Sequence, residues 1–426
     1  MIVYLICYAA SWMFARFGLY YLSGAALFLA AGYLYVYDYR RSGNLIHLRG
    51  LFSCFWVGGQ GAACLKLSKL QTDWALQTWI CFFLALVGFW ITFEVLDRLM
   101  GGNERFTMNR YRQRSTVRPL FFCIVGLTVI SAAAFVTEAA VLGFIPVLVR
   151  GVPHAYSAFH MTGLHYVTVS CVLIPAMTVL YFEQGGSRSG RKNGLIVLCT
   201  LVSIAIPILC VSRFQLVFAV ILAVFTFCAS QKNVSPWLFV AAVVALIPCY
   251  VLLTVARSHD VTYLNGIFEM KNSRMPIFVS QPYIYIANNY ENFDCLVKAL
   301  PAHTWGIRML FPVWALTGLK FLYPYLVSFP IYVDKTELTT VTLIYDAYYD
   351  FGIIGVLVFA CILGAVCFFL VEKLREMKNP MGYLFYGQMA IYMMLSFFTT
   401  WFSNPTTWFY FLVTAVLTFY CSVSRR

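Results

Sequence analysis

Residues 349–372, YDFGIIGVLVFACILGAVCFFLVE, decide the fold class, because no side chain between Asp350 and Glu372 is charged. An α-helix needs about 20 predominantly apolar residues to cross the hydrocarbon core of a bilayer. The stretch therefore predicts a membrane-spanning helix. Similar apolar stretches recur along the chain, so we expect an all-α polytopic membrane protein.

The composition of the whole chain favours the same class. Of its 426 residues, 61% are hydrophobic and only 11% are charged, whereas an ordinary soluble domain has roughly 45–50% apolar and about 25% charged residues. This much apolar surface excludes a soluble globular enzyme. Disorder is excluded as well, because disordered chains are poor in apolar and aromatic residues.

Hydropathy predicts about twelve transmembrane helices in a single integral membrane domain, residues 1–426. The third span is rich in glycine, with Gly58, Gly59 and Gly61, which indicates a kink or close packing on a neighbouring helix. The twelve spans lie near residues 2–15, 17–37, 51–69, 74–95, 119–140, 162–183, 193–211, 214–230, 235–255, 349–372, 382–400 and 403–423.

The distribution of charge predicts the orientation. The formal net charge is +13, and most Lys and Arg residues fall in one set of alternate loops. Cytoplasmic loops collect Lys and Arg, so we expect both termini in the cytoplasm. We interpret the first apolar segment as a membrane span that enters from the inside, so we expect no cleavable signal peptide. The positive charge then reflects topology, and nucleic acid is not an expected partner. The basic set consists of 38–50, 96–118, 184–192, 231–234, 372–380 and the C-terminal tail.

Residues 256–348 form one large extracytoplasmic loop in this topology. Loops longer than about 15 residues are usually functional or disordered, and this one is rich in tyrosine and apolar residues. Within it, 309–333 is apolar but is interrupted by Pro312, Pro324 and Pro330, which break helical hydrogen bonding. We expect interfacial or re-entrant helical pieces there, and much of an active site in the loop.

Cysteines and histidines give no sign of a disulfide framework or a metal site. Of the 14 Cys, only Cys295 lies away from a predicted span, and the chain has no CxxC, HExxH or DxD motif. His160 and His165 are five residues apart, which on a helix places them on different faces. We therefore expect no metal and no other cofactor.

Basic residues at the outer ends of spans are candidates for binding an anion. Arg213 lies in a tight turn between two spans, where it either holds a phosphate bidentately or extends to lipid headgroups. Arg257, Arg274 and Arg308 lie in the large loop.

Three histidines are candidates for a general base, because a histidine pKa lies near neutrality. His259 stands beside Arg257 and Asp260, and His303 and His165 also lie on the outer side. Glu138, near the outer end of its span, either accepts a hydrogen bond from a substrate hydroxyl or pairs with an Arg. The loop tyrosines, Tyr283 and Tyr285 among them, suit either sugar rings or the membrane interface.

Five segments spread along nearly the whole chain carry a resemblance to a known family. The chain resembles the Wzy-type polymerases of bacterial O-antigen and capsular polysaccharide, also called oligosaccharide repeat unit polymerases. The segments are TEAAVLGFIPVL (137–148), AFHMTGLHY (158–166), SRFQ (212–215), YIYIANNYENF (283–293) and TLIYDAYYDFGIIG (342–355).

The resemblance implies an inverting, metal-independent glycosyl transfer at the outer face of the bacterial inner membrane. A glycan on undecaprenyl pyrophosphate would be the donor, and a second lipid-linked repeat unit the acceptor. Membrane lipids surround such an enzyme, and a chain-length-regulating protein is a further candidate partner. The implied roles are diphosphate binding by Arg213, Arg257, Arg274 and Arg308, base catalysis by His259, His303 or His165, and sugar binding by Glu138, Tyr283, Tyr285 and Asn288.

Three other functions stay open. An O-antigen ligase handles the same donors but transfers finished chains, and the sequence does not separate ligase from polymerase. A flippase or transporter often has internal repeats, and the two halves of this chain show no convincing repeat. A mannosyltransferase-like enzyme with monophosphate polyprenyl donors typically has an acidic pair in its first outer loop, which here is little more than Arg16.

Overall fold

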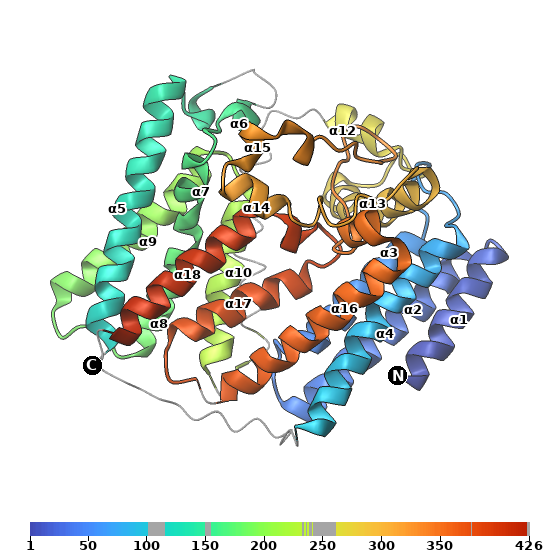
Figure 1. Cartoon of the computed structure of the whole chain (residues 1–426), viewed down its shortest axis with the longest axis horizontal. Coiled ribbons are helices and arrows are strands. Elements are labelled where there is room, and N and C mark those ends of the chain that lie inside the picture. The colour runs from blue at the N-terminus through green and yellow to red at the C-terminus, as the bar shows by residue number, and fades with distance from the viewer. Residues whose placement is uncertain are drawn as a thin grey trace. The chain divides into compact units, whose positions relative to one another are not determined.

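The structure is a computed structural model that describes residues 1–100, 116–149, 155–231, 234–235, 237, 241, 261–375 and 377–423. Every regular element within these ranges is a helix, which confirms the all-α class (Figure 1). The α-helices are α1 (Ile2–Arg16), α2 (Tyr20–Ser42), α3 (Leu48–Cys64), α4 (Leu76–Leu99), α5 (Val117–Leu142), α6 (Ala155–Ala158), α7 (Leu164–Val169), α8 (Ile174–Glu183), α9 (Gly190–Leu209), α10 (Arg213–Ser230), α12 (Val261–Phe268), α13 (Ile277–Ala299), α14 (Phe311–Leu316), α15 (Leu319–Leu322), α16 (Tyr345–Arg375), α17 (Met381–Met394) and α18 (Pro405–Val423).

Seven helices in the described ranges are long and apolar enough to cross a membrane, so the chain is a multi-pass membrane protein. They are α4, α5, the continuous run from α7 to α8, α9, α10, α16 and α18. Helices also occupy the predicted spans at α1, α2, α3 and α17, but α1, α3 and α17 have only 15, 17 and 14 residues. The ninth predicted span lies almost entirely outside the described residues. Twelve crossings and the orientation therefore stay predictions.

The chain divides into two compact units, which we describe one at a time. The first unit comprises Met1–Phe106, Asp260–Glu372 and Tyr392–Thr407, and the second comprises Thr107–His259, Lys373–Ile391 and Trp408–Arg426.

In the first unit, α1 packs on α2 and α2 packs on α3. Glycines make the second contact close: a Cβ on Gly24 would lie 2.8 Å from the carbonyl oxygen of Gly61. On another part of α3, a Cβ on Gly59 would lie 2.5 Å from the Tyr290 hydroxyl of α13. The close packing predicted for this glycine-rich span is thus confirmed.

Buried and half-buried ion pairs join the ends of α2, α3 and α4. Arg49 is only 2% exposed; it donates to Asp38 at 2.6 Å and to Glu94 at 3.0 Å, and its guanidinium lies 4.1 Å from the Trp90 ring centroid. Arg41 pairs with Asp97 at 2.8 Å. Two of the cations on the predicted cytoplasmic side are therefore neutralised by neighbouring helices.

Helix α13 ties the large loop to the segment between α3 and α4 through buried carboxylates. Glu291 accepts hydrogen bonds from Lys66, from the Trp74 indole at 2.8 Å and from the Thr72 amide at 3.2 Å. Burial raises the pKa of Glu291, and the charge of Lys66 opposes that shift. One turn later, Asp294 accepts from the Ala75 amide at 2.9 Å. The polar side of α13 thus faces protein rather than water.

Short helical pieces follow α13, as expected for 309–333. Besides α14 and α15, the 3₁₀ turn η4 covers Pro324–Leu326. Pro312 is the second residue of α14 and Pro324 the first of η4, and in the first turn of a helix a missing amide donor costs little. The prolines therefore divide this apolar stretch into separate turns.

In the second unit, α5 contacts α7, α8 and α9, and α10 packs on α8. Gln388 of α17 donates to Thr414 of α18 at 2.7 Å, and the Tyr410 hydroxyl of α18 donates to the Val169 carbonyl at 3.2 Å. Every Cys within the described residues is a free thiol, with the sulfurs of Cys123 and Cys421 3.9 Å apart.

We expect Glu291→Ala to destabilise the protein strongly, because it leaves Lys66 buried without its counter-charge. Losing one partner of a buried ion pair costs about 3–5 kcal/mol. Unfolding of the purified protein in detergent should show this loss, whereas Glu337→Ala, at an exposed position, should cost less than about 0.5 kcal/mol. Replacing both Lys66 and Glu291 by Met should recover much of the stability. A double variant no more stable than Glu291→Ala would contradict this account.

Candidate functional site

In the first unit, a tight loop before α14 wraps around the carboxylate of Asp350. One oxygen of Asp350 accepts from the Thr304 hydroxyl and from the Arg308 amide at 3.2 Å, and the other accepts from the Met309 amide at 2.7 Å. Trp305 and Gly306 have positive φ angles of 55° and 96°, which turns successive amides toward the same point. The loop conformation therefore depends on this one buried carboxylate.

This loop aims the Arg308 side chain at helix α16. Its Nε donates to Asp346, and its guanidinium carbon lies 4.5 Å from the ring centroid of Tyr349 and 5.3 Å from that of Tyr345. Burial alone would lower the pKa of Arg308, but the Asp346 carboxylate outweighs that effect and raises the pKa. The guanidinium thus stays charged in a place largely shielded from water.

Arg308 and Asp346 line a pocket of about 350 Å³ within the first unit. Its walls combine apolar side chains with hydroxyl and amide groups. The other lining residues are Phe311, Val327, Phe329, Ile331, Thr400, Ser403, Asn404 and Pro405. Pockets of this size bind small molecules or parts of larger ligands.

His303 lies in the same loop but is not among the residues that line this pocket. Its Nδ1 donates to the Tyr349 carbonyl at 3.2 Å, which leaves Nε2 as the acceptor nitrogen. The ring packs on Gly352, where α16 is kinked with a φ of 62°. A Cβ on Gly352 would lie 2.9 Å from His303 Nε2, so only glycine leaves room for the ring.

A second polar cluster surrounds Glu138 in the second unit. The buried carboxylate accepts from the Thr168 hydroxyl at 2.7 Å, from His165 Nδ1 at 3.2 Å and from the Met161 amide at 3.1 Å. Among the contacts that the structure gives for Glu138, the ionisable partner is His165.

The expected separation of His160 and His165 is wrong. Their ring centroids are 5.0 Å apart, because the helix begins only at Leu164, after Gly163 with a φ of 88°. A spacing rule for helices therefore does not apply to the pair. Within the described part of the chain, no group of three potential metal ligands forms around them or elsewhere.

Arg213 is the first residue of α10 and is 8% exposed. The preceding Val211 has a φ of 53° and packs with Leu216 against Val147 and Ile204. This apolar contact fixes the turn between α9 and α10 and holds Arg213 inside the second unit rather than extended to lipid.

The remaining predicted residues lie apart from these groups or outside the description. Arg274 is exposed in the turn before α13. Tyr283 is buried, and its hydroxyl donates to Gln71 at 2.6 Å and accepts from the Leu67 amide at 2.9 Å. Tyr285 is 37% exposed with its ring near Phe398, and Asn288 is buried and donates to Asn292 at 3.3 Å. Arg257 and His259 lie outside the described residues.

Sequence reasoning missed the two acidic residues that organise the loop. Asp346 and Asp350 are four residues apart at the start of α16, so they share one helix face. The signal was present in YDAYYD, where two acidic residues precede a long apolar span.

Comparisons of the chain with known protein families, curated proteins and solved structures found no match.

We expect Asp350→Asn to loosen the loop that carries Arg308. The amide would turn its NH₂ group toward a backbone N–H, so at least one hydrogen bond to a charged acceptor is lost, a cost of about 1.5–3 kcal/mol. Hydrogen exchange of the amides at 304–310 should become faster. Asp73→Asn, at an exposed position, should leave these rates unchanged, and unchanged rates in Asp350→Asn would contradict the assigned role.

We expect Gly352→Ala to destabilise the protein for two separable reasons. Gly352 has φ 62° and ψ −146°, a backbone conformation that costs a residue with a side chain about 1–3 kcal/mol, and the added Cβ collides with the His303 ring. Adding His303→Ala should relieve the collision but leave the backbone cost. Unfolding measurements on both single variants and the double variant should therefore show coupling of about 0.5–3 kcal/mol. Simple additivity would contradict the contact.

Proposed function

We propose that this membrane protein is a polysaccharide polymerase of the Wzy type. It joins undecaprenyl-pyrophosphate-linked oligosaccharide repeat units at the outer face of the bacterial inner membrane, with twelve spans and both termini in the cytoplasm. The acceptor hydroxyl attacks the anomeric carbon of the donor, the bond from that carbon to the phosphate oxygen breaks, and undecaprenyl pyrophosphate leaves. A general base takes the proton from the hydroxyl.

The observation that carries the proposal is Arg308, whose side chain is only 15% exposed and lines the pocket in the large loop. A diphosphate leaving group develops negative charge in the transition state, and a preorganised cation stabilises that charge. Among the described residues, the guanidinium hydrogen bonds only through Nε to Asp346. Its two Nη groups remain for phosphate oxygens, in the bidentate manner of Arg–phosphate pairs.

The walls of the pocket also suit a lipid-linked sugar. Thr400, Ser403 and Asn404 offer hydroxyl and amide groups on one side, which is the chemistry that sugar hydroxyls require. Phe311 and Phe329 offer apolar faces that match the C–H-rich faces of sugar rings. In this proposal His303 remains a candidate base from the same loop, with His165 and His259 as the other two.

We expect Arg308→Ala to abolish polymer formation in a bacterial strain that lacks the chromosomal gene. Removing one group that stabilises transition-state charge typically slows a reaction about 10²–10³-fold. Arg308→Lys should retain part of the activity, because the charge stays but the bidentate geometry is lost. The readout is the length distribution of the surface polysaccharide, together with the amount of protein in the membrane.

The matched control is Lys271→Ala, which removes an exposed cation from the same loop and should leave polymer length unchanged. Full-length polymer with Arg308→Ala would contradict the role of the arginine. Deletion of the gene separates the alternatives: a lost polymerase leaves single repeats, whereas a lost ligase leaves polymer on undecaprenyl pyrophosphate. Elongation of lipid-linked repeats by the purified protein in lipid, without an ion gradient, would exclude a transporter.

A further inference from the structure

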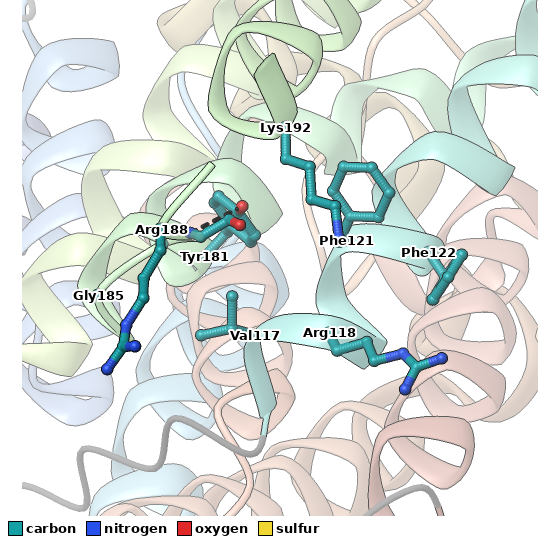
Figure 2. A pocket seen from close by; sticks show the side chains of 10 residues that line it. Val117, Arg118, Phe121, Phe122, Tyr181, Gly185, Arg188 and Lys192 are labelled. Atoms are coloured by element: carbon teal, nitrogen blue, oxygen red, sulfur yellow. Dashed lines mark hydrogen bonds between the residues drawn. The ribbon is translucent and has the colours of Figure 1, made fainter. Parts of the chain in front are cut away.

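A second pocket, of about 500 Å³, lies within the second unit where three helices end (Figure 2). It lies at the first turn of α5, the last turn of α8 and the first turn of α9, together with the short connection 184–189. The positive-inside prediction places these three ends on the cytoplasmic side. The pocket is therefore separate from the outer-face chemistry proposed above.

The connection between α8 and α9 has a fixed conformation. The Ser187 amide donates to the Tyr181 hydroxyl and to Asn193 Oδ1, both at 3.0 Å, and Asn193 Nδ2 donates back to the Ser187 carbonyl at 3.0 Å. Gly185 and Gly186 have positive φ angles of 100° and 60°. These hydrogen bonds fix the conformation of the turn, and its residues 185–188 line the pocket.

Three cations from three different elements line this pocket: Arg118 of α5, Arg188 of the connection and Lys192 of α9. None of the described lining residues is acidic. The nearby Glu183 accepts hydrogen bonds from Ser230 and Gln231. Lys192 lies 5.7 Å from the Phe121 ring, and Arg118 lies 6.0 Å from the Phe122 ring. Figure 2 shows the Lys192 side chain directed toward Phe121, with Val117 between Arg188 and Arg118 in the view.

We propose that this pocket binds the phosphate of an anionic phospholipid headgroup from the cytoplasmic leaflet. Three cations line this concavity and none of its described lining residues is acidic, which favours a polyvalent oxyanion. Arg pairs with phosphate oxygens bidentately. Basic pockets between membrane helices on the cytoplasmic side are a recognised setting for lipid headgroups. Phe121 and Phe122 supply the apolar surface that the first carbons of the lipid chains require.

The competing explanation is a general attraction of cytoplasmic cations to anionic lipid. Such attraction depends on the number of charges near the surface and not on their placement. A site in a pocket depends on Arg118, Arg188 and Lys192 together. Exposed cations elsewhere on the predicted cytoplasmic side provide a matched comparison, namely Arg40, Arg191 and Lys373.

The test is native mass spectrometry of the full-length protein in detergent, titrated with phosphatidylglycerol and, separately, with phosphatidylcholine. One variant carries Arg118→Gln, Arg188→Gln and Lys192→Gln; the control carries Arg40→Gln, Arg191→Gln and Lys373→Gln. Both lose three charges. We expect the pocket variant to bind phosphatidylglycerol at least about tenfold more weakly than the control, and phosphatidylcholine to bind weakly to every form.

Equal losses in the two variants, or no loss in the pocket variant, would overturn the proposal. Inorganic phosphate is the second probe, and displacement of phosphatidylglycerol by equimolar phosphate would show a site for soluble phosphate and overturn the lipid assignment. Because a triple variant can fail to fold, Lys192→Arg and Lys192→Gln are compared as single changes. Binding that is retained in Lys192→Arg and weakened in Lys192→Gln would support the site. Identical binding in the two variants would contradict it.

Discussion

The need of each buried charge for an opposite charge or for hydrogen-bond donors is the constraint on which the described structure depends. An uncompensated charge away from water is costly, so Arg49 lies between Asp38 and Glu94, Lys66 contacts Glu291, and Arg308 contacts Asp346. Each pair joins segments that are separate in the chain. The helices supply apolar surface, and these pairs fix which segments meet at the helix ends.

The proposed outer site illustrates how such pairing produces chemistry. Asp350 fixes the loop, the loop orients Arg308, and Asp346 with the Tyr349 ring holds the guanidinium at the edge of a pocket. Arg308 donates to the Asp346 carboxylate through Nε, which leaves its two Nη groups for other acceptors. The pocket lined by Arg118, Arg188 and Lys192 differs, because its described lining residues include three cations and no acidic side chain. The Asp346 carboxylate positions Arg308, whereas the three cations of the second pocket are proposed to meet an external anion.

Much of the fold was predictable from hydropathy, because the apolar lengths of helices such as α5 and α16 are set by bilayer thickness. The prolines of 309–333 correctly predicted short helical pieces, and the glycines of α3 correctly predicted close packing. The site was less predictable. Arg308 was one of several cations predicted on the outer side. The roles of Asp346 and Asp350 were not predicted, because the local sequence does not show which loop folds back on a helix. We expected His160 and His165 to lie on different faces of one helix. The helix begins only after Gly163, so helical spacing does not apply to this pair.

The sequence alone therefore determined the class, a helical multi-pass membrane protein, because burial of apolar residues and the cost of charge in lipid act locally along each segment. Only the tertiary structure decided which charges meet. Lys66 and Glu291 are 225 residues apart and Arg308 and Asp346 are 38 apart, and neither spacing indicates a contact. Such pairings arise from the packing of whole helices, since a buried charge accepts whichever opposite charge the neighbouring segment brings within reach.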